Sequence, residues 1–544
     1  MESGAIIMRK EKVQQFTASN ELDRYSNTSN ENIKIGLEIH CQLTSLKTKL
    51  FCGCYSNYRE HGPNENVCPI CLGLPGSLPL LNKKAVEYAS MICIAFNCNI
   101  PEKITFYRKN YFYPDLPKNF QITQYNSYEL SSIGYDGFIS YKENEGDDND
   151  TTSNSQIYDK NKTIVRIKRI QLEEDPGKIV YEDNNLKVIN YCLIDYNRAG
   201  VALVEIVTEP DFDNATDVRL FLNKITNIFE YLGVSDPNLE GAVRCDVNVS
   251  IKGGKKVEIK NISSFKDVEK SIFYEITRQK TLSVHEIKIK SETRHWDEKR
   301  KITIAARTKE EEDEYKYFPE PDIPRIVLGK DFKNIIKEKM PELPIDRLKR
   351  YKNVHNLSNH VCKILINNKR VSDFYEESLK LYNSPKEISN WIINELLSKV
   401  QNDEGKENIA TENLFVNSGF RENKFFNLDV SPQQIADIAK LVEESSINRN
   451  TAKNIFNKSI KTGESPLKLI KIIKAEKISD EQELIKNINE VLYAEPNLIE
   501  QSTNNPNIYN FILGKIMKKT NGRADPQLTI KLIKKEIEDK KLNK

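Results

Sequence analysis

The sequence predicts an α+β protein in which a sheet-dominated first part is followed by helical parts. From Ile33 to about Pro324 the chain alternates short apolar runs with Gly, Pro and Asn, and it has few helical stretches, such as 82–97 and 214–232. After the Pro-rich segment YFPEPDIPRI, apolar residues recur at helical spacing instead. The 544 residues leave room for three or four domains of about 150 residues each.

Composition and charge exclude some classes of protein. Hydrophobic residues make up 38% of the chain, and no apolar run approaches the ~20 residues that a membrane helix needs, so we expect no membrane association. The net charge of +2 gives no overall attraction to nucleic acid, so any such binding must come from a local patch. Residues 515–544 form one, because they hold ten Lys and Arg against four Asp and Glu.

Changes in apolar pattern and composition along the chain predict four segments. They are a leader over 1–32, a sheet domain over 33–325 with a disordered Asn/Asp-rich insert at 142–163, a helical domain over 326–465 and a small helical tail domain over 466–544. The leader lacks the apolar centre of a secretory signal. Its weak patterning leaves an organelle presequence open.

The first predicted strand, KIGLEIHCQL at 34–43, has one chemically unusual face. Alternation places Glu38, His40 and Gln42 opposite a row of apolar residues. The run VRCDVNVSI repeats the pattern, and so does VEIKNISSF; their polar faces carry Arg244, Asp246, Asn248, Ser250, Glu258 and Lys260. A solvated sheet face explains any one of these strands, but three together favour a shared site.

Further acids lie in two later runs. Glu173, Glu174 and Asp175 precede a Pro-Gly turn, and Glu205 interrupts an otherwise apolar strand. Because an unpaired buried carboxylate is costly to ionise, Glu205 needs a cation partner, often a metal. Several carboxylates and an imidazole suit Mg²⁺ or Mn²⁺. With no P-loop pattern in the chain, this set indicates a nucleotide site outside the P-loop class.

Four cysteines have the spacing of a zinc site. Cys52 and Cys54 are separated by thirteen residues from Cys68 and Cys71, which gives a CxC and a CxxC pair. Disulfides are the competing interpretation, but a chain without a secretory signal favours zinc. Four thiolates fill a tetrahedral shell, so the expected zinc is structural.

The segment FYRKNYFYPDLPKNFQITQYN combines aromatic, proline and basic residues. It is either a buried rigid loop or the wall of an active site. In the second case Arg108 and Lys109 are available to phosphate, and Tyr111 or Tyr113 can stack on a base.

Ten ordered motifs resemble one known family. They are IGLEIH, FCGC with VCPICLGLPGSLP, RKNYFYPDLPKNFQITQY, LEEDPGK, LIDYNRAG, EIVTEPD, EGAVRCDVNVS, EIKNISSF, ETRHWDE and YKYFPEPDIP. Over about residues 33–544 the chain resembles the B subunits of aspartyl/glutamyl-tRNA amidotransferases, the GatB/GatE family of the GatCAB complex. The resemblance implies that the sheet domain is a catalytic cradle, and that the tail is a YqeY-like domain that binds tRNA.

The resemblance also implies an activity and a set of site residues. In this family ATP phosphorylates the side-chain carboxylate of Glu-tRNA(Gln) or Asp-tRNA(Asn), and ammonia then displaces the phosphate; the enzyme is a glutamine-dependent amidoligase. The match places Mg²⁺ on Glu38, His40, Glu173 and Glu174. The residues expected to act in catalysis are Glu38, His40, Glu173, Glu174, Glu205, Arg244 and Asp246. Those expected to bind the cofactor ATP are Arg108, Lys109, Tyr111, Asn248 and Lys260.

Partners follow from the same resemblance. The chain has neither a GxSxG elbow nor the Gly-Gly-Ser-Ser stretch of an amidase, so ammonia must come from another protein of the complex. The family supplies a glutamine-hydrolysing A subunit and a small C subunit, and misacylated tRNA is the expected substrate.

The sequence departs from the family pattern at three positions. Gln171 stands where many members have His, Pro176 replaces a small residue, and Gln42 occupies a position where some members have an acid. These changes put a second metal in doubt, although the four Mg²⁺ residues above form a sufficient shell with water.

Two other functions and two locations stay open. A non-catalytic zinc-containing RNA-binding module would explain the cysteines and the basic tail. An ATP-dependent ligase acting on a free small acid fits less well, because such a substrate offers nothing for a basic tail to hold. The leader and the Asn-rich insert favour the mitochondrial matrix, with a bacterial-type cytoplasm as the alternative. The sequence does not decide between the two misacylated tRNAs.

Overall fold

The computed structural model describes ten segments of the chain. These are residues 33–126, 129–141, 164–180, 191–308, 315–398, 430–444, 446–473, 480–502, 508–520 and 524–542. The predicted leader, 1–32, and the predicted insert, 142–163, lie outside the described residues.

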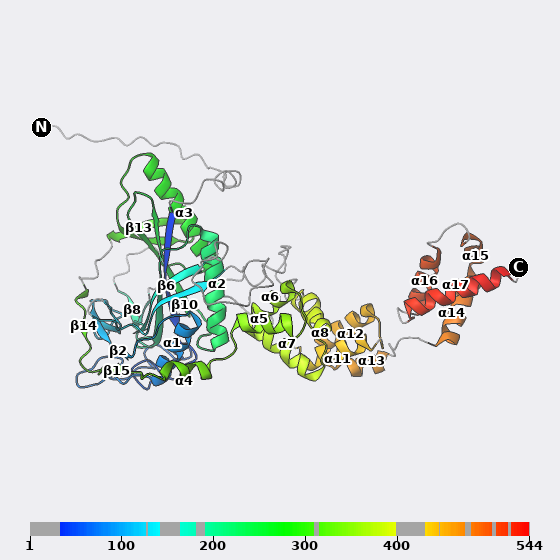
Figure 1. Cartoon of the computed structure of the whole chain (residues 1–544), viewed down its shortest axis with the longest axis horizontal. Helices are drawn as coiled ribbons and strands as arrows, with labels where there is room; N and C mark the ends of the chain where they lie inside the picture. The colour runs from blue at the N-terminus through cyan, green and yellow to red at the C-terminus, as the bar shows by residue number, and fades with distance from the viewer. Residues whose placement is uncertain are drawn as a thin grey trace.

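An eight-stranded sheet organises the first part of the chain (Figure 1). Its strand order is β13-β12-β11-β10-β1-β9-β6-β5, and all neighbours are antiparallel except β11 and β12. The strands are β1 (Ile33–Gln42), β5 (Gly134–Ser140), β6 (Ile164–Glu174), β9 (Ala202–Thr208), β10 (Val243–Ile251), β11 (Val257–Lys260), β12 (Glu292–Asp297) and β13 (Ile302–Thr308). The central strand is β1, the one whose polar face is unusual.

Three helices build the first hydrophobic core with the apolar face of this sheet. They are α1 (Lys83–Ala95), α2 (Ala215–Leu232) and α3 (Phe265–Val284). The side chains of Asn82, Asn214 and Ser264 accept hydrogen bonds from the first helical turns, which explains where the helices begin. The sequence predicted α1 and α2 within two residues at each end, but α3 was not among the stretches it singled out.

Smaller sheets flank the large one. The strands β3 (Tyr107–Asn110), β4 (Phe120–Thr123) and β14 (Phe318–Pro319) form one of them; β2 (Lys103–Ile104) pairs with β15 (Ile326–Val327), and β7 (Lys178–Val180) pairs with β8 (Leu193–Asp195). Contacts between β4 and β6 place the three-stranded sheet beside the acidic end of β6. The aromatic-basic segment is therefore partly strand.

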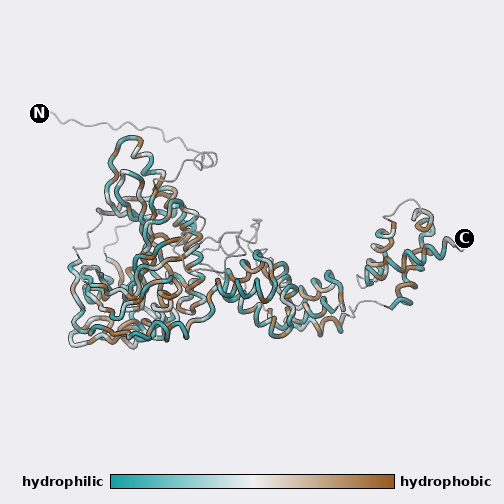
Figure 2. The backbone as a smooth tube through the Cα atoms, viewed as in Figure 1, coloured by the Kyte–Doolittle hydropathy of each residue, from teal (hydrophilic) through white to brown (hydrophobic). Residues whose placement is uncertain are grey.

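The rest of the described chain is helical, as predicted, and apolar and polar residues alternate along its helices (Figure 2). Its buried residues form two further cores. Its first helices are α4 (Phe332–Lys339), α5 (Pro344–Asn353), α6 (Asn359–Ile366), α7 (Lys369–Leu381) and α8 (Pro385–Asn390), followed by a π-helical segment (Trp391–Leu397), α11 (Pro432–Glu443), α12 (Arg449–Thr462) and α13 (Pro466–Ile473). The last are α14 (Glu481–Ala494), α15 (Asn497–Gln501), α16 (Ile508–Lys519) and α17 (Pro526–Leu542). Apolar periodicity thus predicted both fold classes along the chain.

The cores do not divide where the predicted boundaries lie. Ile336 of α4 belongs to the first core, after the predicted boundary at 325, and Leu469 of α13 belongs to the second core, after the predicted boundary at 465. Each boundary falls before an element that packs back onto the preceding core.

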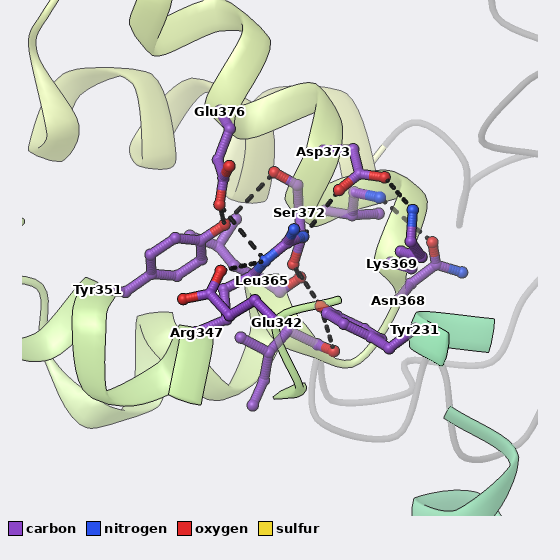
Figure 3. A network of polar contacts seen from close by, with 12 residues as sticks. Tyr231, Glu342, Arg347, Tyr351, Leu365, Asn368, Lys369, Ser372, Asp373 and Glu376 are labelled. Atoms are coloured by element: carbon purple, nitrogen blue, oxygen red, sulfur yellow. Dashed lines mark hydrogen bonds and ion pairs between the residues drawn. The ribbon is translucent and has the colours of Figure 1, made fainter. Parts of the chain in front are cut away.

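A polar joint connects α2 to the second core (Figure 3). The Tyr231 hydroxyl donates to the Ile366 carbonyl at 3.1 Å and lies 2.7 Å from Ser372 Oγ. Arg347 lies over the Tyr231 ring and pairs with Asp373 at 2.8 Å.

Among the described residues, no helix is both long and apolar enough to cross a membrane.

Candidate active site

The strand register brings the predicted polar residues onto one open face of the sheet. Glu38 pairs with Asp246, and His40 lies between Arg244 on β10 and Glu205 on β9. Paired positions in antiparallel strands place their side chains side by side. Segments far apart in sequence therefore meet at β1, and the apolar residues between them point into the core.

Four side chains form what we call the acid cluster: Glu38, His40, Glu173 and Glu205. Ligand atoms of Glu38, His40 and Glu205 all lie within 4.8 Å of one another. His40 Nε2 is 3.5 Å from Glu173 Oε1 and 3.9 Å from Glu38 Oε1. Carboxylate oxygens and one imidazole nitrogen at this spacing fit a hard divalent cation such as Mg²⁺ or Mn²⁺.

Two of the three carboxylates of the acid cluster, Glu205 and Glu38, have opposite pKa shifts. Burial, and then the charges of Glu38 and Glu173, raise the pKa of Glu205 to about 7. Burial also opposes ionisation of Glu38, but His40, Lys260, Lys109 and Arg169 together outweigh it and lower its pKa to about 2. At Glu205, burial and two neighbouring carboxylates thus outweigh Arg169 and His40, and a cation bound beside it would favour its charged form.

Basic side chains surround the acid cluster. Lys260 Nζ lies 2.8 Å from Asp246 and 3.8 Å from Glu258, and an Arg169 nitrogen lies 3.8 Å from Glu205. The Lys109 ammonium stacks on aromatic rings, 4.8 Å from the centroid of Tyr315 and 5.6 Å from that of Tyr111. Within the described segments no ion pair joins Lys109 to a carboxylate, so its charge is available to an anionic ligand.

Glu174, predicted as a magnesium ligand beside Glu173, lies apart from the acid cluster. Consecutive residues of a strand point to opposite faces. The Glu174 carboxylate binds Lys118 Nζ at 2.5 and 2.6 Å and accepts a hydrogen bond from the Ile122 amide at 2.9 Å. Glu173 instead accepts a hydrogen bond from Thr123 Oγ1 at 3.2 Å.

Arg244 belongs to a network around the buried Asp175. Arg244 donates to Asp175 Oδ1 at 2.9 Å, Gln42 donates to Asp175 Oδ2 at 2.7 Å, and Arg198 lies 3.8 Å away. The amide of Gln42 also accepts a hydrogen bond from Arg59 at 2.8 Å. Gln42 therefore holds a carboxylate in place of supplying one.

The other two departures, Gln171 and Pro176, also lie in hydrogen-bond networks near the site, Gln171 through its side chain and Pro176 through its backbone. Gln171 accepts a hydrogen bond from Arg169 at 3.0 Å and donates to the Gln124 carbonyl at 2.5 Å. The Pro176 carbonyl accepts from Arg198 at 2.9 Å. Gln171 lies opposite Glu205 in the register, so it borders the acid cluster without adding a charge.

Arg108, predicted to contact phosphate, is engaged by carboxylates. It forms a bidentate pair with Glu320 at 2.7 and 2.8 Å, approaches Asp322 at 3.2 Å and stacks on Phe120. In the strand register Phe318 of β14 pairs with Arg108 of β3. Arg108 therefore holds residues 315–320 beside β3, which places Tyr315 next to Lys109.

Asn248 and Tyr111 have surroundings suited to a ligand. Asn248 Oδ1 is a buried oxygen with no hydrogen-bond partner among the described residues, which is uncommon in folded proteins. The Tyr111 ring makes edge contacts with Tyr113 and Tyr315 at 6.0 and 5.9 Å. Burial, and then the charges of Glu173 and Asp115, raise the pKa of Tyr111, so its hydroxyl stays protonated.

The four predicted zinc cysteines converge in a second cluster, which we call the cysteine knuckle: Cys52, Cys54, Cys68 and Cys71. Their sulfur atoms all lie within 4.8 Å of one another. All ten cysteines are free, so the structure contains none of the disulfides of the competing interpretation. A hydrogen bond from Cys52 lowers the pKa of Cys71 to about 5 against the effect of burial, and Lys49 assists.

A cavity of about 190 Å³ separates the cysteine knuckle from the three-stranded sheet. Its walls include Cys71, Leu74, Arg108, Lys118, Glu174 and Glu320. The knuckle, the Lys118–Glu174 pair and the Arg108–Glu320 pair are therefore neighbours.

Three residues of the site were missed by the sequence prediction. Arg169 shares a face with Gln171 and Glu173, so the alternation that identified Glu38 and His40 could have identified it. Asp175 was recognised as part of an acidic run but not as the partner of Arg244. Lys118 lies in the aromatic-basic segment that the sequence singled out, but its pairing with Glu174, 56 residues away, had no local signal.

An acid cluster on a sheet, with an imidazole within it and basic side chains around it, has the composition expected of an enzyme site for anionic substrates. The chain belongs to the GatB/GatE family. The model of the GatB/GatE catalytic domain matches residues 33–334, and that of the GatB domain matches 373–537.

Curated relatives match along nearly their whole length. The B subunit of the aspartyl/glutamyl-tRNA(Asn/Gln) amidotransferase of Saccharolobus solfataricus is 41% identical over 505 residues, which cover 93% of this chain and 99% of the relative. The B subunits of the same enzyme from Persephonella marina and a Thermotoga species are 40% and 38% identical, covering 92% and 93% of this chain and 98% of each relative.

Proposed function

We propose that this chain is the component that amidates misacylated tRNA, converting Glu-tRNA(Gln), Asp-tRNA(Asn) or both to the correctly charged form. The observation that carries the proposal is the acid cluster, formed by motifs of the GatB/GatE family on neighbouring strands. The reaction needs such a site. A carboxylate is a poor electrophile, and its phosphorylation by ATP brings two anions together before ammonia displaces the phosphate.

The acid cluster fits the Mg²⁺ that this chemistry requires. Glu38, His40 and Glu205 would hold the ion, with Glu173 beside His40, because these groups offer clustered oxygen and nitrogen ligands. When bound, Mg²⁺ offsets the charge between the phosphate and the substrate carboxylate. The placement of Glu174 supports a different role for this residue, that of fixing Lys118 at the edge of the site.

The chain's basic residues orient the two anionic substrates. Lys109 and Lys260 lie close enough to Glu38 to lower its pKa, so they are placed to attract phosphate oxygens. Tyr111 offers a ring for the adenine base, and Asn248 offers an unsatisfied amide oxygen for a polar substrate group. Arg244 and Asp246 lie on β10 beside His40 and Glu38, and they add a positive and a negative charge to this face of the sheet. Arg108 has an indirect role: its pair with Glu320 holds residues 315–320, which include Tyr315, beside β3.

The cysteine knuckle is proposed to hold a structural zinc ion. Four sulfur atoms within mutual reach, with no fifth ligand among the described residues of the cluster, fit a closed tetrahedral shell. The helical region and the YqeY-like tail, which the sequence divides at 465/466, are proposed as separate domains, with the tail holding tRNA through its basic excess. The cores favour boundaries near 343 and 480.

The enzyme is proposed to work with an amidase A subunit that supplies ammonia and with a small C subunit, because its relatives are named as the B subunits of an amidotransferase. The relatives described are archaeal and bacterial, so they give no support to the mitochondrial location that the sequence suggested. A bacterial-type cytoplasm is the proposed alternative.

Reconstitution tests the proposal directly. The chain is purified with its A and C partners, and ATP hydrolysis is measured with misacylated tRNA, with correctly charged tRNA and without tRNA. Hydrolysis that requires misacylated tRNA and yields amidated aminoacyl-tRNA is expected. An RNA-binding module would bind the tRNA without hydrolysing ATP.

A further inference from the structure

Lys49 is a fully buried lysine beside the cysteine knuckle. Its side chain has 0% exposure, although lysine is among the residues least often buried without a partner. The ammonium donates to the Asn66 carbonyl at 2.9 Å and lies 3.8 Å from Cys71 Sγ. The Lys49 backbone amide also binds the Cys54 carbonyl at 3.0 Å, so the residue contacts both cysteine pairs.

A buried ammonium needs a nearby negative charge, and carboxylates do not provide one here. In the described part of the chain no ion pair joins Lys49 to an acid. Glu174 approaches the same region, since its Oε2, Lys49 Cδ and Cys71 Cβ all lie within 4 Å of the point where a Cβ on Gly200 would stand. However, the Glu174 carboxylate is already bound by Lys118 at 2.5 Å. Cys71 Sγ, 3.8 Å from the ammonium, is a neighbouring atom that carries negative charge when the knuckle binds a metal as thiolates.

The charge of a loaded knuckle matches this arrangement. Four thiolates around one divalent ion carry two net negative charges, and burying them without compensation is unfavourable. Hydrogen-bond donors behind the ligands commonly set the affinity of such sites. The Cys68 amide is one such donor, 3.1 Å from Cys71 Sγ, but it carries no charge.

We propose that Lys49 is the charge partner of the cysteine knuckle, a positioning residue that sets how tightly the four thiolates hold a metal ion. The inference rests on the zinc site of the proposed function and not on the amidation activity. It gives a role to a buried lysine that takes no part in the proposed amidation mechanism.

Lys47 provides a matched control. Lys47 precedes Lys49 by two residues, and its carbonyl accepts a hydrogen bond from the Ser56 amide. Both lysines therefore lie in the backbone segment that pairs with residues 54–56. The Lys47 side chain, however, is exposed. Replacement of either lysine by Met removes one charge from one segment, but only the change at Lys49 removes it from the knuckle.

The test is zinc affinity of the full chain, measured by competition with a chromogenic chelator, for the parent, Lys49→Met, Lys49→Gln and Lys47→Met. Lys49→Met and Lys49→Gln should weaken zinc binding about 10- to 100-fold, the usual effect of losing a group behind a metal ligand. Lys47→Met should match the parent. Lys49→Gln keeps a donor for the Asn66 carbonyl, so its weak binding would identify charge as the cause.

Other outcomes overturn the inference. Parent-like affinity of both Lys49 variants does so and leaves the zinc site standing, whereas a parent chain without zinc refutes the zinc site as well. If the Lys49 variants fold only in excess zinc, the affinity defect is confirmed. If they stay unfolded in saturating zinc while Lys47→Met folds, Lys49 serves packing and the proposal fails.

Discussion

The network around Asp175 gives a stability prediction that can be worked from the structure. The Asp175 side chain is fully buried, and its carboxylate pairs with Arg244 at 2.9 Å. Asp175→Asn keeps the shape and removes that charge. Breaking a buried pair costs about 3–5 kcal/mol, but the Arg244 side chain is 38% exposed, so water replaces part of the lost partner and we expect about 2–3 kcal/mol.

The matched control is Asp211→Asn. Asp211 binds Arg166 at 2.6 Å, but the Arg166 side chain is 63% exposed, and such surface pairs contribute about 1 kcal/mol or less. The assay is urea unfolding monitored by hydrogen exchange in peptides from β1, β9 and β10, which separates the sheet from the helical cores. If Asp175→Asn costs no more than Asp211→Asn, the buried network is not what holds these strands in register.

The same substitution has a pH signature. Burial opposes ionisation of Asp175, but Arg244 and Arg198 outweigh it and hold its pKa below the usual 3.8. A carboxyl with a lowered pKa contributes stability that is present above its ordinary pKa and lost as the pH falls through the folded value. The difference between parent and Asp175→Asn should therefore be full near neutral pH and shrink below about pH 4.

Three further outcomes follow from the site. Glu205→Gln should stabilise the metal-free protein on the order of 3 kcal/mol at about pH 8 and little at pH 4.5, because a pKa raised from 4.5 to about 7 costs stability as the pH rises through that window; equal effects at both pH values in urea unfolding would contradict it. Cys68→Ser should lower zinc content and the thermal midpoint together, and metal analysis that finds no zinc in the parent would refute the site. Removing residues 480–544 should raise the KM for aminoacyl-tRNA and weaken its salt dependence with little change in kcat; unchanged tRNA affinity would exclude the tail as the tRNA-binding part.

Residue spacing predicted the features that depend only on the order of residues within one strand or loop. The alternation in β1 and β10 placed Glu38, His40, Arg244 and Asp246 on one face, because side-chain direction in a strand follows from position alone. The cysteine spacing predicted the knuckle for a similar reason, since two short pairs are each held by a local turn.

Long-range pairing was beyond the sequence. His40 lies on β1 and Glu173 on β6, with β9 between them, so their contact depends on the strand order and could not be worked out from spacing. Arg108 was predicted to meet phosphate from the basic and aromatic character of its segment, and its partner Glu320, 212 residues away, could not be recognised from the sequence. The grouping of Glu174 with Glu173 ignored the opposite directions of consecutive strand residues. Helix α3 was missed because its apolar positions are interrupted by polar ones such as Ser271 and Gln279, which are nevertheless buried.

The central claim is that the acid cluster is where the carboxylate of misacylated tRNA is activated. Glu38→Gln tests it most directly, because the change removes a charge while keeping shape. Its effects on folding oppose each other, since the attraction of Glu38 to Lys109 and Lys260 and its repulsion from Glu205 are lost together. The control is Glu240→Gln, the same change at an exposed position of the same domain.

The measurement is ATP-dependent amidation of misacylated tRNA by the reconstituted complex, with ammonia supplied directly so that the glutaminase step is bypassed. Glu38→Gln should reduce the amidation rate by about a hundredfold or more, the scale of losing one electrostatic group at a reacting centre. It should leave tRNA binding and glutamine hydrolysis intact, and Glu240→Gln should behave as the parent. If Glu38→Gln amidates with ammonia at near the parental rate, the acid cluster is not the site of activation.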